Sequence, residues 1–166
     1  MKFDYYSALS TEALRIKDIF KSKKTQRETL KLESDKWREM IADRLGEDFL
    51  PPMDRRDLLS LIQNLSYISY EVKRLPGLGR FDSAEGLLLK NALNHCLEAL
   101  IDETNKLKKR ESCPLRLRRK AYGLLSVWHS SLVAHCDPLL CDGYEAAGDA
   151  ILRYADALET AIMDIA

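Results

Sequence analysis

The sequence predicts an all-α fold, an up-and-down bundle of six helices. Apolar residues recur at spacings of three and four along most of the 166 residues, as on the buried face of a helix, and no stretch alternates as a strand would. All 5 prolines stand between these apolar stripes, where helices are expected to end. A chain of this length buries roughly 70% of the surface that it exposes when unfolded, which is enough for a stable core.

The first three helices are expected at about 3–22, 26–46 and 54–75. The clearest apolar stripe belongs to the third, and its members follow one another at intervals of three or four residues: Leu58, Leu61, Leu65, Ile68, Val72 and Leu75. Such a stripe is typical of a helix that packs at a shallow angle in a bundle. Asp54 is the candidate N-cap of the third helix, and Ser10 and Thr11 lie early in the first.

The remaining helices are expected at about 82–111, 115–135 and 139–164. Asp82, followed three residues later by Glu85, is similar to a capping box with Asp in place of Ser. The run Pro76-Gly77-Leu78-Gly79 separates three helices from three. We therefore expect a single helical domain, 1–166, built from two three-helix halves at approximately 1–78 and 79–166.

The composition limits the classes of partner and location. Lysine and arginine number 26 and so do aspartate and glutamate, so overall charge gives no reason to expect nucleic acid. The longest apolar run, Gly86 to Leu89, is far too short to span a membrane, and the first ten residues contain no secretory apolar core. No C-x-x-C pair occurs among the cysteines, which are Cys96, Cys113, Cys136 and Cys141. We expect four reduced thiols in a cytoplasmic protein.

Charge is distributed unevenly along the chain. The segment from Lys106 to Lys120 has eight basic residues and one acid, Glu111. Its second half stands at the start of the fifth helix, where the helix dipole disfavours cations. The residues concerned are Arg116, Arg118, Arg119 and Lys120. They are candidates for docking an acidic partner or a membrane surface, or for pairing with acids elsewhere in the bundle.

Acidic residues form columns on two of the expected helices. At 100° per residue, Glu145, Asp149 and Asp156 fall within 40° of one another, opposite the apolar stripe of the last helix. Asp35 belongs to a similar column, with Glu28 and Glu39, on the second helix. Carboxylates spaced in this way can share a di- or trivalent metal ion, although the spacing alone is more typical of a solvated helix face.

Two segments of the sequence match the motifs of a known family. One is close to the phrase F-I-T-P-x-D-R-E-D-I, which stands between two helices. Seven residues match this phrase in order, with Pro51 and Arg56 as departures: Phe49, Leu50, Pro52, Asp54, Arg55, Asp57 and Leu58. The final helix from Tyr144 matches an E-x-x-x-D motif at Glu145 and Asp149 and has a further acid at Asp156. In these two segments the chain resembles the phosphate-transport regulators distantly related to PhoU.

The resemblance implies a six-helix PhoU-like bundle whose acidic motifs can hold divalent or ferric metal ions. The metal candidates on the second helix are Glu33 and Asp35, and those on the last are Glu145, Asp149 and Asp156. Two motifs depart from the family. Lys31 replaces the first acid of the second helix, and Ser66-Tyr67-Ile68-Ser69-Tyr70 replaces the acidic cluster of the third.

We therefore expect a non-enzymatic accessory protein that regulates phosphate transport by docking to a phosphate permease or a regulatory protein. No catalytic triad spacing or glycine-rich phosphate loop indicates an enzyme. The alternative is a metal-binding or structural homo-oligomeric bundle with no role in transport. Tyr67 and Tyr70 could mark a homodimer patch, or Tyr70 could belong to the core.

Overall fold

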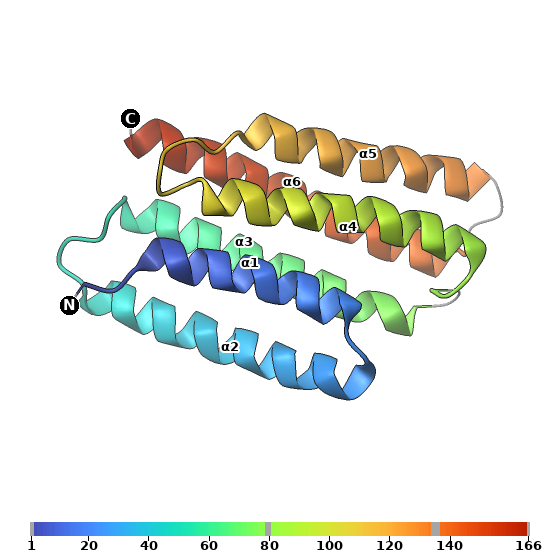
Figure 1. Cartoon of the computed structure of the whole chain (residues 1–166), viewed down its shortest axis with the longest axis horizontal. Coiled ribbons are helices and arrows are strands. Elements are labelled where there is room, and N and C mark those ends of the chain that lie inside the picture. Colours follow the sequence, from blue (N-terminus) through green and yellow to red (C-terminus); the bar gives the residue numbers. More distant parts are fainter. Residues whose placement is uncertain (1, 79–80, 134–136, 166) are drawn as a thin grey trace.

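The computed structural model describes residues 2–78, 81–133 and 137–165 and forms a bundle of long helices (Figure 1). The helices are α1 (Tyr5–Lys21), α2 (Lys24–Glu47), α3 (Arg55–Arg74), α4 (Ala84–Asn105), α5 (Pro114–Val133) and α6 (Pro138–Ile165), with a short 3-10 helix, η1 (Leu75–Gly77), after α3. No strand occurs within the described ranges. The predicted all-α, six-helix fold is confirmed.

Successive helices run in opposite directions, so the connections alternate between the two ends of the bundle (Figure 1). Helices α1, α2 and α3 pack against one another, and so do α4, α5 and α6. The two sets meet where α1 packs on α4 and α3 packs on α6. A continuous hydrophobic core passes through all six helices and includes the fully buried Leu9, Ile41, Leu65, Leu93 and Leu124.

The helix starts follow from local capping. The Asp54 carboxylate accepts a hydrogen bond of 2.7 Å from the Arg56 backbone N–H, so the predicted cap of α3 is confirmed. Helix α1 starts earlier than Ser10, because Asp4 accepts from the Ser7 N–H at 3.1 Å. The prediction for the fourth helix is wrong by one residue. Ser83 is its cap, accepting from the Gly86 N–H at 3.0 Å, whereas the adjacent Asp82 pairs with Lys90.

Helix α4 ends at Asn105, six residues before the predicted end. The chain then turns, and Arg110 adopts a left-handed conformation with φ of 59°. The buried carboxylate of Glu103 explains the turn, because it accepts hydrogen bonds from the Cys113 backbone N–H and, at 3.5 Å, from the Ser112 hydroxyl. These bonds hold residues 106–113, which we call the basic connection, against the end of α4.

Helices α2 and α6 differ in how much of their surface is buried. Helix α6 is rich in buried small residues, and a Cβ atom at Gly148 would lie only 3.3 Å from the Leu125 side chain of α5. Any larger residue would require the end of the Leu125 side chain to shift by a few tenths of an ångström, which glycine avoids. The buried residues of α2 are Ser34, Trp37, Ile41 and Leu45, all in its second half or near its middle. Much of the polar face of α2 is therefore available to line an open groove.

One prediction about the cysteines is wrong. Cys96 and Cys113 are free thiols, but Cys141 is disulfide-bonded, so it is not reduced in this structure. Cys136 lies outside the described residues, as does the predicted end of the fifth helix at residue 135. Within the described part of the chain, no helix combines the length and apolar character that crossing a membrane requires.

Candidate functional site

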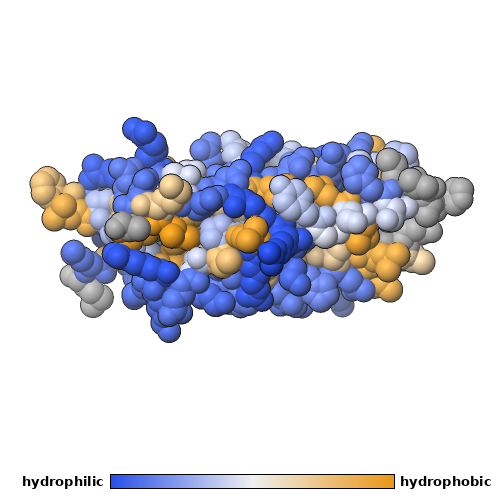
Figure 2. All heavy atoms as spheres, turned by 90° about the horizontal axis from the view of Figure 1, so that it is seen from above, coloured by the Kyte–Doolittle hydropathy of each residue, from blue (hydrophilic) through white to orange (hydrophobic). Residues whose placement is uncertain are grey.

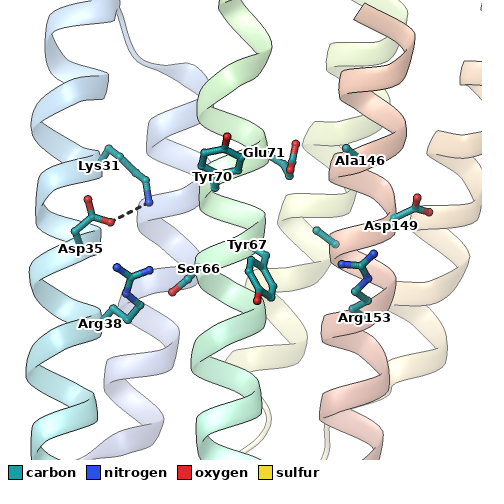
Figure 3. Close-up of a pocket in the computed structure, with 11 residues that line it drawn as sticks. Lys31, Asp35, Arg38, Ser66, Tyr67, Tyr70, Glu71, Ala146, Asp149 and Arg153 are labelled. Carbon is teal, nitrogen blue, oxygen red and sulfur yellow. Dashed lines mark hydrogen bonds and ion pairs between the residues drawn. The ribbon is translucent and has the colours of Figure 1, made fainter. Parts of the chain in front are cut away.

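A groove with a volume of about 750 Å³ lies between α2, α3 and α6 (Figure 3). Its walls carry polar and charged side chains from all three helices. The lining residues are Lys31, Asp35, Arg38, Ser66, Tyr67, Tyr70, Glu71, Ala146, Asp149, Ala150 and Arg153. A groove of this volume falls within the range of small-molecule binding sites.

Helical spacing explains why these residues meet. On α2, Lys31, Asp35 and Arg38 follow at intervals of four and three residues and therefore share one face. On α3, Tyr67 and Tyr70 are three residues apart and line the same groove, with exposed fractions of 45% and 53%. The alternative that Tyr70 belongs to the core is therefore wrong.

Two of the three carboxylates in the groove already have cationic partners. The Lys31 ammonium lies 3.1 Å from the Asp35 carboxylate, and Glu71 pairs with Arg74 at 3.1 Å. Among the described residues, neither Arg38 nor Arg153 forms an ion pair. In Figure 3 their guanidinium groups face the groove from opposite walls, with Tyr67 between them, while the Asp149 carboxylate points away from Tyr67.

The hydroxyl groups of the groove differ in what they can offer a ligand. The Tyr67 hydroxyl accepts a hydrogen bond of 2.9 Å from the Gln63 side-chain amide, which leaves its own proton available. The Ser66 hydroxyl donates to the Ile62 carbonyl oxygen at 3.0 Å, so its proton is already used. Among the described residues that line the groove, the side-chain donors without a protein acceptor are therefore Arg38, Arg153, Tyr67 and Tyr70.

The residues predicted to bind metal do not form one site. Asp35 and Asp149 line the same groove, on α2 and α6. Glu33 lies 3.8 Å from the Arg15 guanidinium, Asp156 lies 2.7 Å from that of Arg118, and Glu145 is half-buried on α6. Across the described residues, no group of three or more His, Cys, Asp or Glu side chains is placed to hold a metal ion.

Half of the predicted basic docking cluster is paired within the protein. Arg116 lies 3.1 Å from Asp102 and 3.4 Å from Glu103, both near the end of α4. Arg118 pairs with Asp156 and Glu159 of α6. Arg119 and Lys120 are exposed and form no ion pair with other described residues. For Arg116 and Arg118, the alternative of pairing with acids elsewhere in the bundle is the one that the structure shows.

A second surface lies at the end of the bundle that carries the α2–α3 and α4–α5 connections, which we call the α2–α3 end (Figure 1). Phe49 and Leu50 are 88% and 68% exposed there. Leu50 and Pro52 line a hollow together with Lys108 of the basic connection, whose ammonium lies 3.5 Å from Asp4. Figure 2 shows hydrophobic side chains projecting at this end. An apolar tip beside basic residues is typical of a binding surface.

The same end contains a carboxyl group with a perturbed pKa. Burial, and to a smaller extent a hydrogen bond with Asp164 at the end of α6 and the charge of that residue, together raise the pKa of Asp57 to about 6. Asp57 is also one of the residues that match the family phrase. Asp57 lies in the first turn of α3, directly after the α2–α3 connection.

The basic side of the groove was not predicted from the sequence. Lys31 stood out only as the loss of an acid, and neither Arg38 nor Arg153 was a predicted site residue. The spacing of Lys31, Asp35 and Arg38 along one helix face was the available signal. This spacing indicates charges of alternating sign on one helix face. Such a face does not provide the acidic metal site that was expected.

Comparison with known proteins does not assign the chain to a family. No protein-family model matches the chain, and no curated protein matches it with significance.

Proposed function

We propose that the protein is a non-enzymatic PhoU-like accessory protein that regulates phosphate transport by docking to a phosphate permease or its regulatory partner. The proposal combines the sequence resemblance with one structural observation. The segment that carries the resemblance exposes Phe49 and Leu50 almost completely, although both are large and apolar. Two adjacent exposed apolar residues at a loop tip cost solubility without serving the core, so a partner that covers them explains their exposure.

Exposed cations beside this tip can pair with acidic groups of a partner, on a surface that also carries the acids Glu47, Asp54 and Glu111. The cations are Arg55 and Arg56 and, in the basic connection, Lys108, Lys109 and Arg110. Complementary rim charges speed association and select the partner, while a central apolar contact supplies most of the affinity. We therefore place the docking surface at the α2–α3 end. Arg119 and Lys120, at the start of α5, extend its basic character.

Deleting the gene in the source organism and measuring phosphate uptake tests the role. We expect altered uptake, or altered signalling of phosphate starvation, and restoration by the wild-type gene. The double variant Phe49→Ser, Leu50→Ser should fold but fail to restore regulation. Leu32→Ser is the matched control, because Leu32 is also apolar and 62% exposed but lies on α2.

Two results would contradict the proposal. Unchanged uptake and unchanged starvation signalling in the deletion strain would exclude a role in phosphate transport. Full restoration by the Phe49→Ser, Leu50→Ser variant would exclude the α2–α3 end as the docking surface. Circular dichroism of the purified variants separates a loss of docking from a loss of folding.

A further inference from the structure

We infer that the groove between α2, α3 and α6 binds a phosphate monoester, with its phosphoryl group between Arg38 and Arg153 and its remaining part against Tyr67 and Tyr70. This inference rests on different residues from the proposed docking surface and does not depend on it. It assigns a ligand to a groove whose acidic residues had suggested a metal ion.

The charge balance of the groove favours an anion. Among its three carboxylates, Asp35 and Glu71 are neutralised by Lys31 and Arg74. The Asp149 carboxylate points away from Tyr67 (Figure 3). The two guanidinium groups that face Tyr67 from opposite walls have no ionic partner among the described residues. The lining as a whole has three cations and three carboxylates, so positive charge is in excess only locally, beside these two unpaired guanidinium groups.

The available donors fit a phosphoryl group. A guanidinium presents a planar fork of N–H groups that matches two oxygens of one phosphate, and Arg38 and Arg153 offer two such forks from different helices. The Tyr67 hydroxyl, which accepts from Gln63, can donate its proton to a third oxygen. Because Arg38 and Arg153 lie on opposite walls with Tyr67 between them, both long side chains must turn inward over Tyr67 to share one phosphoryl group (Figure 3).

The size and lining of the groove indicate a ligand larger than inorganic phosphate. A volume of about 750 Å³ far exceeds that of one phosphate ion. Tyr67 and Tyr70 expose much of their ring surface, and Ala146 and Ala150 of α6 add a short apolar wall. An aromatic or apolar group can bury its surface against these side chains. A phosphate monoester with an aromatic body meets both conditions.

Isothermal titration calorimetry with three probes tests the inference. The probes are adenosine 5′-monophosphate, inorganic phosphate and adenosine, each titrated into the full chain. We expect the nucleotide to bind more tightly than phosphate and adenosine to bind far more weakly than the nucleotide. If phosphate binds as tightly as the nucleotide, the phosphoryl site stands and its source is free phosphate.

Variants then assign the binding to the groove. Arg38→Gln and Arg153→Gln should each weaken nucleotide binding roughly 10-fold or more, because each removes a charge-assisted hydrogen-bonding group. Arg38→Lys keeps the charge but loses the planar fork of N–H groups, so its affinity for the nucleotide should lie between those of wild type and Arg38→Gln. Lys36→Gln is the matched control, since Lys36 is an exposed cation on the same helix that does not line the groove.

Three results would overturn the inference. One is a dissociation constant weaker than about 1 mM for both phosphate-containing probes. Another is nucleotide binding that Arg38→Gln and Arg153→Gln leave unchanged. The third is equal affinity for adenosine and for its monophosphate. Thermal unfolding of each variant shows whether it is folded, and all substitutions lie on exposed or groove-lining positions outside the core.

Discussion

The guanidinium of Arg118, on α5, lies 2.7 Å from a carboxylate oxygen of Asp156, on α6, and also contacts Glu159. Hydrogen bonds from these two carboxylates raise the pKa of Arg118 above its ordinary value. The contact joins a residue predicted to dock a partner with one predicted to bind metal. Asp156 therefore fastens α5 to α6 on the surface of the bundle.

Replacing Arg118 by Gln should lower the free energy of unfolding by about 0.5–1 kcal/mol, because its partners Asp156 and Glu159 are exposed and ion pairs with exposed groups contribute little. Urea unfolding of Arg118→Gln, Asp156→Asn and the double variant gives the coupling energy of the pair. We expect this coupling to be favourable and to shrink as salt is raised. A coupling of zero at low salt would show that the contact does not stabilise the fold.

A buried hydrogen bond between α4 and α6 should matter more. The hydroxyl groups of Thr104 and Tyr154 lie 2.7 Å apart, and both side chains are buried. Tyr154→Phe leaves Thr104 without this partner and should lower the free energy of unfolding by about 1–3 kcal/mol. Tyr144→Phe is the matched control, because the buried Tyr144 hydroxyl has no hydrogen-bond partner among the described residues. Equal losses in the two variants would contradict this account.

Regular patterns within one helix could be predicted from the sequence, whereas contacts between distant segments could not. Helical periodicity identified all six helices, because the buried stripe of each, such as Leu58 to Leu75, is long and regular. The end of α4 was missed because Glu103, within the helix, accepts hydrogen bonds from the chain ten residues later. Such a contact depends on the path of the connection and leaves no periodic pattern.

The candidate site was only half predictable for a related reason. Angular position along one helix correctly placed Asp35 and Asp149 on polar faces, and both line the groove. Arg38 and Arg153 belong to different helices, so positions along single helices do not reveal that the two lie on opposite walls of this groove (Figure 3). It also could not show that Asp156 is paired with Arg118. The charge of a site is set by the neighbours that the fold supplies.

The basic connection at the α2–α3 end should depend on Glu103. This buried carboxylate accepts from the Cys113 N–H and lies 3.4 Å from Arg116. Glu103→Ala should lower the free energy of unfolding by about 1–3 kcal/mol, because the Cys113 N–H loses its acceptor. It should also increase hydrogen exchange in residues 106–113, measured by mass spectrometry.

Asp102→Ala provides the control for this variant. Asp102 also pairs with Arg116, at 3.1 Å, but its side chain is half exposed. Its removal should cost less than about 1 kcal/mol and leave exchange in residues 106–113 unchanged. If both variants raise exchange equally, the surface pair and not the buried carboxylate holds the connection.

Asp57 should make the stability of the bundle fall as pH rises from about 4 to about 6. Its pKa is about 6 in the folded protein, against an ordinary value of 3.8, because the group is buried and lies beside Asp164. The folded state therefore keeps a proton that the unfolded state has lost, so this group's stabilising contribution is complete below about pH 4 and is lost as pH rises through 6. Asp57→Asn should remove that fall, and Asp164→Asn should reduce it by removing a neighbouring charge. Thermal unfolding from pH 4 to pH 8 tests both, and parallel profiles for wild type and Asp57→Asn would show that Asp57 does not titrate in this range.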